Sequence, residues 1–212
     1  MKGLILNDIY SIQRDIKSSI IFSVACVIFL ILTKNVIAFK VAVFLPFLII
    51  PVKSFEVLKY DVKSGWEKFM ITLPVTRTQI VQSKYITFLI LLILSLLLSL
   101  ILFFAVDILY YPTFTLVYYN HLLRGMGLII CVAALLYPMT YKLGIEKSDS
   151  IILYSLCFSF GVFFFLAMLA KMILAENRNA DMIFSIVFFL VSIFLLIISY
   201  LVACMIVARK EY

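Results

Sequence analysis

The stretch that decides the fold is residues 85–106, YITFLILLILSLLLSLILFFAV, which contains no Asp, Glu, Lys or Arg. A helix needs about 20 consecutive apolar residues to cross the hydrocarbon core of a bilayer. Residues 85–106 meet that length without a charged side chain, so they predict a transmembrane helix. Residues 151–170 and 182–208 meet the same criterion.

The composition of the whole chain agrees with this interpretation. Hydrophobic residues make up 66% of the 212 residues, charged residues only 14%, and the mean hydropathy is +1.20. Soluble domains contain about 45–50% apolar residues, so a water-soluble fold is excluded. At roughly 20 residues per span, the length predicts one all-α integral membrane domain of about six transmembrane helices. The predicted spans are residues 18–33, 36–54, 85–106, 122–141, 151–170 and 182–208.

The second span, residues 36–54, is the least regular. Only about a dozen residues separate Lys40 from Lys53, which is short for a transmembrane helix. Pro46 and Pro51 lie between them, and proline interrupts the hydrogen bonding of a helix. The segment therefore predicts either a complete span or a broken, re-entrant helix.

The distribution of basic residues predicts the orientation. Lys and Arg concentrate on the cytoplasmic side of membrane proteins when the loops are short. Suppose that all six segments cross and that both termini are cytoplasmic. Most of the 18 basic residues then lie on the cytoplasmic side, and those on the outside are Lys34, Lys40, Arg124, Lys171 and Arg178. If the second segment did not cross, every later loop would change sides and the bias would largely reverse. The charges therefore favour six spans with both termini in the cytoplasm.

The N-terminal segment predicts a short amphipathic helix. Its apolar side chains recur at helical spacing, at Leu4, Ile5, Ile9, Ile12 and Ile16. Polar residues, including Asn7, Asp8 and Arg14, fall mainly on the opposite face. A helix of this kind lies in the membrane surface, here as an elbow before the first span. The alternative is that the segment is only the polar start of that span.

The longest polar stretch, residues 55–84, contains the signals of a second short helix. Ser64 and Glu67 have the spacing of a capping box, and Pro74 ends the helical pattern. Between them one apolar face is formed by Trp66, Phe69, Met70 and Leu73. Thr76 and Gln79 repeat the capping-box spacing where the third span begins.

Two environments suit that apolar face. It can lie on the membrane surface as an interfacial anchor, which the only Trp of the chain favours. It can also fill a groove on another protein, with a polar rim formed by Lys63, Glu67, Lys68 and Arg77. The sequence pattern leaves both interpretations open.

The sequence lacks the residues that several classes of function require. No G-x-x-x-x-G-K-[ST] motif is present, so another chain must hydrolyse any ATP that is used. We predict no catalytic site and no metal site, because the single His121 has no second ligand at suitable spacing. The basic residues occur in short segments between spans rather than along one groove, so nucleic acid is not an expected partner, whereas membrane lipid is.

Three segments within or next to residues 55–84 carry a family resemblance. DVKSGWEKF at residues 61–69, TLPVTR at 72–77 and IVQSKY at 80–85 resemble the first cytoplasmic loop of small ABC-2-type transporter permeases of Gram-positive bacteria. The start, MKGLILNDIY at residues 1–10, is also similar to the start of these proteins. The likeness is greatest to permeases encoded with peptide exporters, such as the phenol-soluble modulin transporter.

The resemblance implies a permease subunit of an ATP-binding-cassette exporter in the bacterial cell membrane. Two permease subunits, identical or different, would form the membrane path. Separate cytosolic ABC ATPase subunits, which hold ATP and magnesium, would power it. Because the long apolar runs carry no charge, the expected cargo is amphipathic, such as antimicrobial or phenol-soluble-modulin-like peptides. The alternative from another class is a non-transporting membrane scaffold or assembly factor that recruits a cytosolic partner.

The same resemblance assigns roles to the two short helices. Residues 4–16 would form the elbow helix, and residues 64–73 the coupling helix that meets the ATPase. The residues expected to transmit force from the ATPase are Ser64, Trp66, Glu67, Lys68, Phe69, Met70, Leu73, Pro74 and Arg77. The chain would divide into an elbow (1–17), spans one and two (18–54), a coupling loop (55–84), spans three and four (85–141), a cytoplasmic loop (142–150), spans five and six (151–208) and a cytoplasmic tail (209–212).

Overall fold

The computed structural model describes residues 2–32, 36–70, 72, 74–110, 116–173 and 179–209. These residues form helices and turns and contain no strand, so the predicted all-α fold is confirmed. The helices are α1 (Lys2–Ser11), α2 (Gln13–Leu32), α3 (Val36–Lys63), α4 (Trp66–Met70), α5 (Arg77–Tyr110), α6 (Leu116–Leu143), the short 3₁₀ helix η1 (Ile145–Lys147), α7 (Ser148–Ile173) and α8 (Ala180–Arg209).

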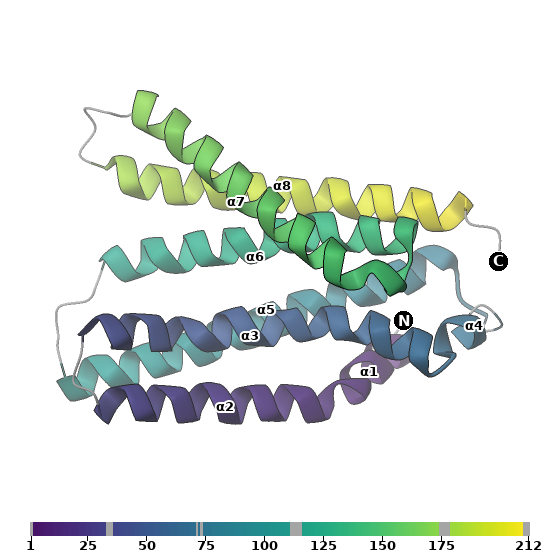
Figure 1. The fold of residues 1–212 in the computed structure, drawn as a ribbon, viewed down its shortest axis with the longest axis horizontal. Helices are drawn as coiled ribbons and strands as arrows, with labels where there is room; N and C mark the ends of the chain where they lie inside the picture. The colour runs from purple at the N-terminus through teal and green to yellow at the C-terminus, as the bar shows by residue number, and fades with distance from the viewer. Residues whose placement is uncertain are drawn as a thin grey trace. The chain divides into compact units, whose positions relative to one another are not determined.

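The helices group into two compact units, Met1–Phe114 (the N-terminal unit) and Thr115–Tyr212 (the C-terminal unit). In the N-terminal unit α3 packs against both α2 and α5, and α1 also contacts α5. In the C-terminal unit α6 packs against α7 and α8. Figure 1 shows that α2 and α3 run antiparallel, and that α6 and α8 run in the same direction while α7 crosses obliquely.

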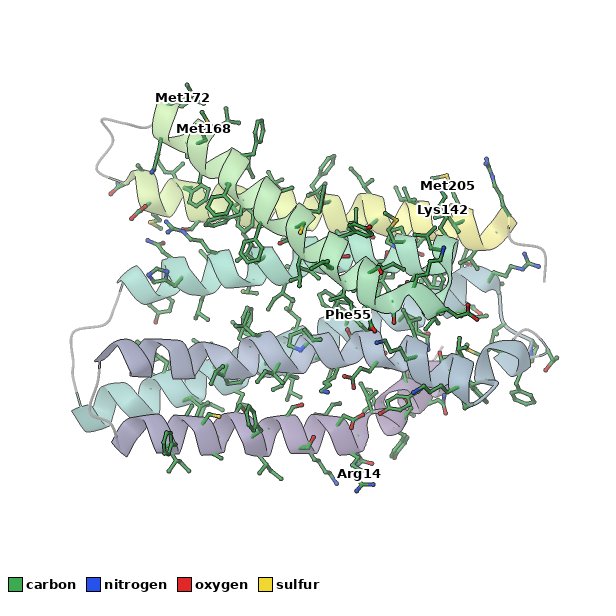
Figure 2. The ribbon with its side chains drawn as sticks, viewed as in Figure 1. Arg14, Phe55, Lys142, Met168, Met172 and Met205 are labelled. Carbon is green, nitrogen blue, oxygen red and sulfur yellow. The ribbon has the colours of Figure 1, made fainter. Side chains whose placement is uncertain are left out.

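The core of the N-terminal unit lies around the junction of α1 and α2. Its buried apolar residues, drawn from this junction, from α3 and from α5, are Ile12, Ile16, Ile50, Val57 and Leu91. In the same unit Phe55 of α3 (Figure 2) and Phe88 of α5 stack with their ring centroids 5.9 Å apart. Packing therefore ties the N-terminal segment to the bundle.

α3 is one uninterrupted helix that contains both Pro46 and Pro51. The structure thus shows the continuous form of this segment rather than the broken one, as neighbouring helices in a bundle permit. The helix runs on to Lys63, so residues 55–63, which the sequence predicts as part of a loop, are helical. Two residues after the end of α3, Gly65 has a φ of +73°, a left-handed conformation that glycine adopts without strain.

In the C-terminal unit α6 and α8 approach each other closely because small side chains line their contact. A Cβ atom on Gly127 of α6 would lie 2.5 Å from the Phe188 ring of α8, so glycine fits there and a larger residue would require that ring to move. Further along the same pair, the Cys131 sulfur lies 3.2 Å from the Ser192 hydroxyl. Small residues and interhelical hydrogen bonds of this kind stabilise helix pairs in membranes.

Within the described residues, four helical segments are long and apolar enough to cross a membrane: Arg77–Phe104, Tyr119–Leu143, Ile145–Ile173 and Ala180–Arg209. Each overlaps one of the last four predicted spans. The first two predicted spans fall on α2 and α3, and residues 33–35 between these helices lie outside the described part. Six spans and a membrane-surface elbow therefore remain predictions.

The outer face of α7 is strongly apolar. Phe164, Phe165, Met168 and Met172 expose between 63% and 71% of their surface. Figure 2 shows Met168 and Met172 projecting outward from this helix. A contiguous apolar surface of this kind suits lipid or another transmembrane helix rather than water.

Candidate functional site

A buried ion cluster joins three helices of the N-terminal unit. The Lys84 ammonium of α5 lies 2.6 Å from Asp8 Oδ1 of α1 and 2.5 Å from Asp61 Oδ2 of α3. These side chains expose only 2%, 1% and 7% of their surface, in the order Lys84, Asp8, Asp61. A buried charge that loses its partner is very unfavourable. The cluster therefore holds α1, the end of α3 and the start of α5 in one arrangement.

In the cluster two carboxylates share one ammonium. Burial raises the pKa of Asp8 above its ordinary value, and the neighbouring Lys84 ammonium offsets part of that rise. The Thr87 hydroxyl also donates to Asp8 Oδ2, at 3.4 Å. Asp8 therefore binds a proton at a higher pH than an exposed aspartate does.

The sequence pattern does not predict this cluster, because it places Asp8 on the polar face of the N-terminal helix. The structure instead buries one residue in every four along this segment, namely Leu4, Asp8, Ile12 and Ile16. Residues spaced by four share a helix face. The spacing of Asp8 from these apolar residues is therefore the sequence signal that it is buried with them. Ile5 and Ile9, on the predicted apolar face, are only half-buried.

α1 is a helix separate from α2 and is set at an angle to it (Figure 1). The change of direction takes place within one turn, where the Ile16 N–H donates to the Ile12 carbonyl at 2.9 Å. Nearby, the Tyr60 hydroxyl of α3 donates to Asp15 Oδ2 at 2.8 Å, and this hydrogen bond raises the pKa of Tyr60. The start of α2 is thus attached to the end of α3, while Arg14 points outward (Figure 2).

The helix predicted over residues 64–73 is shorter in the structure, where α4 covers only Trp66–Met70. Its start is shortened because Ser64 and Gly65 serve to end α3. The Ser64 hydroxyl donates to the Tyr60 carbonyl at 2.8 Å, and the same oxygen accepts the Trp66 N–H at 3.4 Å. Ser64 therefore belongs to a turn between two helices rather than to a longer α4.

The apolar face predicted for α4 is divided between the interior and the surface. Met70 is buried, with 3% of its surface exposed, whereas Phe69 is 52% exposed. Trp66 is half-buried, and its ring centroid lies 5.3 Å from that of Phe69. Trp66 and Phe69 therefore form an accessible aromatic pair, while Met70 anchors α4 to its own unit.

A cavity of about 560 Å³, lined mainly by polar residues, lies between Trp66 and α1. Its lining residues are Asn7, Ser11, Tyr60, Asp61, Lys63, Ser64 and Trp66. Asp61 also binds Lys84, so the ion cluster reaches the cavity wall. The Trp66 indole nitrogen is buried and has no hydrogen-bond partner among the described residues. Buried donors normally have a hydrogen-bond partner.

The second predicted capping box, at the start of α5, is confirmed. The Gln79 N–H donates to Thr76 Oγ1 at 3.3 Å, and the Thr76 N–H donates to the Gln79 side-chain oxygen at 3.1 Å. From this cap α5 reaches Lys84 in roughly two turns of about 3.6 residues. Of the other predicted coupling residues, Ser64, Pro74 and Arg77 are exposed, and Leu73 and the side chains of Glu67 and Lys68 lie outside the described part.

The C-terminal unit has an ion pair of a different kind. Arg124 Nη2 of α6 lies 3.1 Å from Asp181 Oδ1 at the start of α8, and the Asp181 side chain is 88% exposed. The Arg124 Nε–H donates to the Ser185 hydroxyl at 2.9 Å. The guanidinium also lies 4.9 Å from the centroid of the Phe184 ring. This pair therefore lies at the surface, in contrast to the buried ion cluster.

Comparison with known proteins gives one match. A sequence model described as ABC-2 family transporter protein matches residues 3–208, which include both units, the ion cluster and α4. No curated protein and no solved structure matches the chain. No group of His, Cys, Asp and Glu within the described residues has an arrangement that could hold a metal ion.

Proposed function

The chain belongs to the ABC-2 family of transporter proteins, and on this premise we propose that it is an exporter permease whose α4 receives force from a cytosolic ATPase. Membership makes it a multi-pass membrane protein and the permease component of an ATP-binding-cassette transporter. The observation that carries the proposal is the accessible pair of Trp66 and Phe69, which lies beside the buried ion cluster.

The contacts around α4 support a mechanical link to the bundle. α4 follows α3 after only Ser64 and Gly65, and α5 begins at a capped N-terminus a few residues later. Lys84 then binds α5 to α1 and α3. A displacement of α4 would therefore move these helices together, because helices and buried ion clusters are stiff. Rigid elements of this kind can shift a permease between two arrangements.

We place α4 and both termini in the cytoplasm, with α2 and α3 as the first two spans. The excess of Lys and Arg in the loops that would then be cytoplasmic supports this orientation. The 28 residues of α3 extend for about 42 Å at about 1.5 Å per residue, which exceeds a hydrocarbon core of about 30 Å. α3 is thus long enough to cross and still project residues 55–63 from the membrane.

A second permease subunit, identical to this one or different, would complete the membrane path. The proposed cargo is an amphipathic molecule, such as an antimicrobial or phenol-soluble-modulin-like peptide. In its support, the four candidate spans carry their charged residues only toward their ends. Walls of this composition suit an amphipathic cargo better than a hydrated ion. ATP and magnesium would be bound by the ATPase, because this chain has no phosphate-binding loop.

The test of the coupling role compares Trp66→Ala/Phe69→Ala with Phe104→Ala in a complex with a co-expressed ABC ATPase. Phe69 and Phe104 are matched in exposure, at 52% and 51%, but Phe104 lies in a candidate span. We expect the double variant to lower ATPase co-purification and permease-dependent ATPase activity by at least about tenfold, as loss of two aromatic anchors at an interface would. Phe104→Ala should preserve both.

Two outcomes would contradict the proposal. An ATPase that stays bound and fully coupled in the double variant would show that α4 does not receive its force. If the wild-type complex binds the ATPase through α4 but moves none of a panel of amphipathic peptides across proteoliposomes, a membrane scaffold becomes the better description.

A further inference from the structure

The C-terminal unit contains a second cavity, which the coupling site does not use. It has a volume of about 690 Å³ and is formed by α6, α7 and α8. Small or ring-constrained residues, Ala134, Pro138 and Ser199, line it and leave the space unfilled. Phe158 and Ile198 also line it and are 36% and 41% exposed, so the cavity opens at the outer surface of the unit.

The cavity wall has two chemically different parts. Most of it is apolar, but Lys142 and Arg209 stand at one end, close to where α6 and α8 finish. Figure 2 shows Lys142 near Met205 of α8 at that end. No carboxylate lines the cavity, and neither Lys142 nor Arg209 forms an ion pair within residues 116–173 and 179–209. Two cations therefore lie beside an apolar recess with no anion from the described chain.

We propose that this cavity binds an anionic phospholipid, with the headgroup phosphate between Lys142 and Arg209 and an acyl chain along the apolar wall. Basic pockets between transmembrane helices on the cytoplasmic side bind anionic headgroups. The C-terminal ends of α6 and α8 are cytoplasmic ends in the predicted topology. A volume of about 690 Å³ also falls within the range of about 300–1,000 Å³ for small-molecule sites.

Charge complementarity selects lipid over a second protein chain as the occupant. A transmembrane helix with an apolar face would fill the recess but would bury both cations without an anion, which is strongly unfavourable. A phospholipid supplies one anionic group for the two cations and an apolar tail for the rest of the cavity wall. The inference rests on the proposed orientation of the chain in the membrane, but it does not depend on α4 or on the cargo.

The test measures lipid retention by the full-length permease purified in detergent, using native mass spectrometry with added phosphatidylglycerol, phosphatidylcholine or inorganic phosphate. The variant is Lys142→Gln/Arg209→Gln, and its matched control is Lys147→Gln/Lys171→Gln, which removes two cations of the same unit that do not line the cavity. Phosphatidylglycerol affinity should fall about thirtyfold in the first variant, as loss of two lipid-facing cations would produce. It should be unchanged in the control.

A steric variant tests the same site without changing its charge. Ile198→Trp adds bulk at the mouth of the cavity, and Leu190→Trp adds it at an exposed position of α8 that does not line it. Ile198→Trp should lose the bound phosphatidylglycerol, while Leu190→Trp keeps it. Wild-type retention of phosphatidylglycerol by the charge variant, or equal affinity for phosphatidylcholine, would overturn the proposal. So would loss of a dimer in Ile198→Trp with its lipid still bound, because the occupant would then be a second subunit.

Discussion

The N-terminal and C-terminal units use charge in opposite ways. In the N-terminal unit Lys84 is buried between Asp8 and Asp61, and this cluster joins three helices. In the C-terminal unit the Arg124–Asp181 pair lies at the surface, and α6 and α8 are held together by close packing at small residues. A buried ion cluster tolerates few alternative arrangements, whereas packed apolar surfaces can slide or repack. The contacts that allow fewer alternative arrangements therefore lie in the unit that carries α4.

The sharpest test of this contrast is Lys84→Met. Removing the ammonium leaves Asp8 and Asp61 buried beside each other, which should cost about 3–5 kcal/mol of stability. We expect the melting temperature of the detergent-purified protein to fall more for this substitution than for any other proposed here. The measurement is thermal unfolding followed by circular dichroism, with intrinsic fluorescence of Trp66 to report on the N-terminal unit.

The matched substitution in the other unit is Arg124→Met. Asp181 is 88% exposed and stays hydrated when its partner is lost, and the Ser185 hydroxyl keeps its hydrogen bond to the Asp181 carbonyl at 2.8 Å. The expected loss is therefore about 1 kcal/mol or less, the range for surface pairs. Equal losses for Lys84→Met and Arg124→Met would remove the distinction between the two units.

Gly127→Ala tests whether steric fit holds the C-terminal unit. The new methyl group would lie 2.5 Å from the buried Phe188 ring, which must move, and overpacking of this kind costs about 1–3 kcal/mol. Gly161→Ala on α7 is the control, because no atom lies within 4 Å of a Cβ there. Adding Phe188→Leu to Gly127→Ala should recover part of the lost melting temperature. No destabilisation by Gly127→Ala would show that the α6–α8 contact is looser than the structure indicates.

The smallest expected effect is the pH dependence that Asp8 confers. Its pKa in the folded protein is raised above the ordinary value of 3.8, so between these two pKa values the folded state holds more protons than the unfolded state. Stability should therefore fall as pH rises above about 4 and level off above the folded pKa. Asp8→Asn, which resembles the protonated carboxyl, should remove this slope at a cost below that of Lys84→Met.

The measurement for Asp8 is the melting temperature of variant and wild type across the acid to neutral range, compared as a difference at each pH. Asp149→Asn, at an exposed position near the start of α7, serves as the control and should keep the wild-type slope. Parallel curves for Asp8→Asn and wild type would mean that another group causes the pH dependence.

Local features of the sequence predicted much of the fold. Uncharged apolar runs located the helices that became α5 to α8, because a bilayer admits only segments that satisfy their own backbone hydrogen bonds. The capping box of Thr76 and Gln79 located the start of α5, because both partners lie within one turn. The capping box of Ser64 and Glu67 stays a prediction, because the Glu67 side chain lies outside the described part; the Ser64 hydroxyl accepts the Trp66 N–H at the start of α4. Gly65, which follows the end of α3, is another local signal that was present in the sequence.

The sequence by itself determined that this chain is helical, apolar enough for a membrane and equipped with a short aromatic helix after its second long helix. Tertiary structure alone decided that Asp8 meets a lysine 76 residues away, that Met70 faces inward while Phe69 faces outward, and that Lys142 and Arg209 share one cavity. Helix periodicity states which residues share a face but not which faces meet. That choice depends on side chains far apart in the chain, whose charges and volumes are matched only once the helices pack.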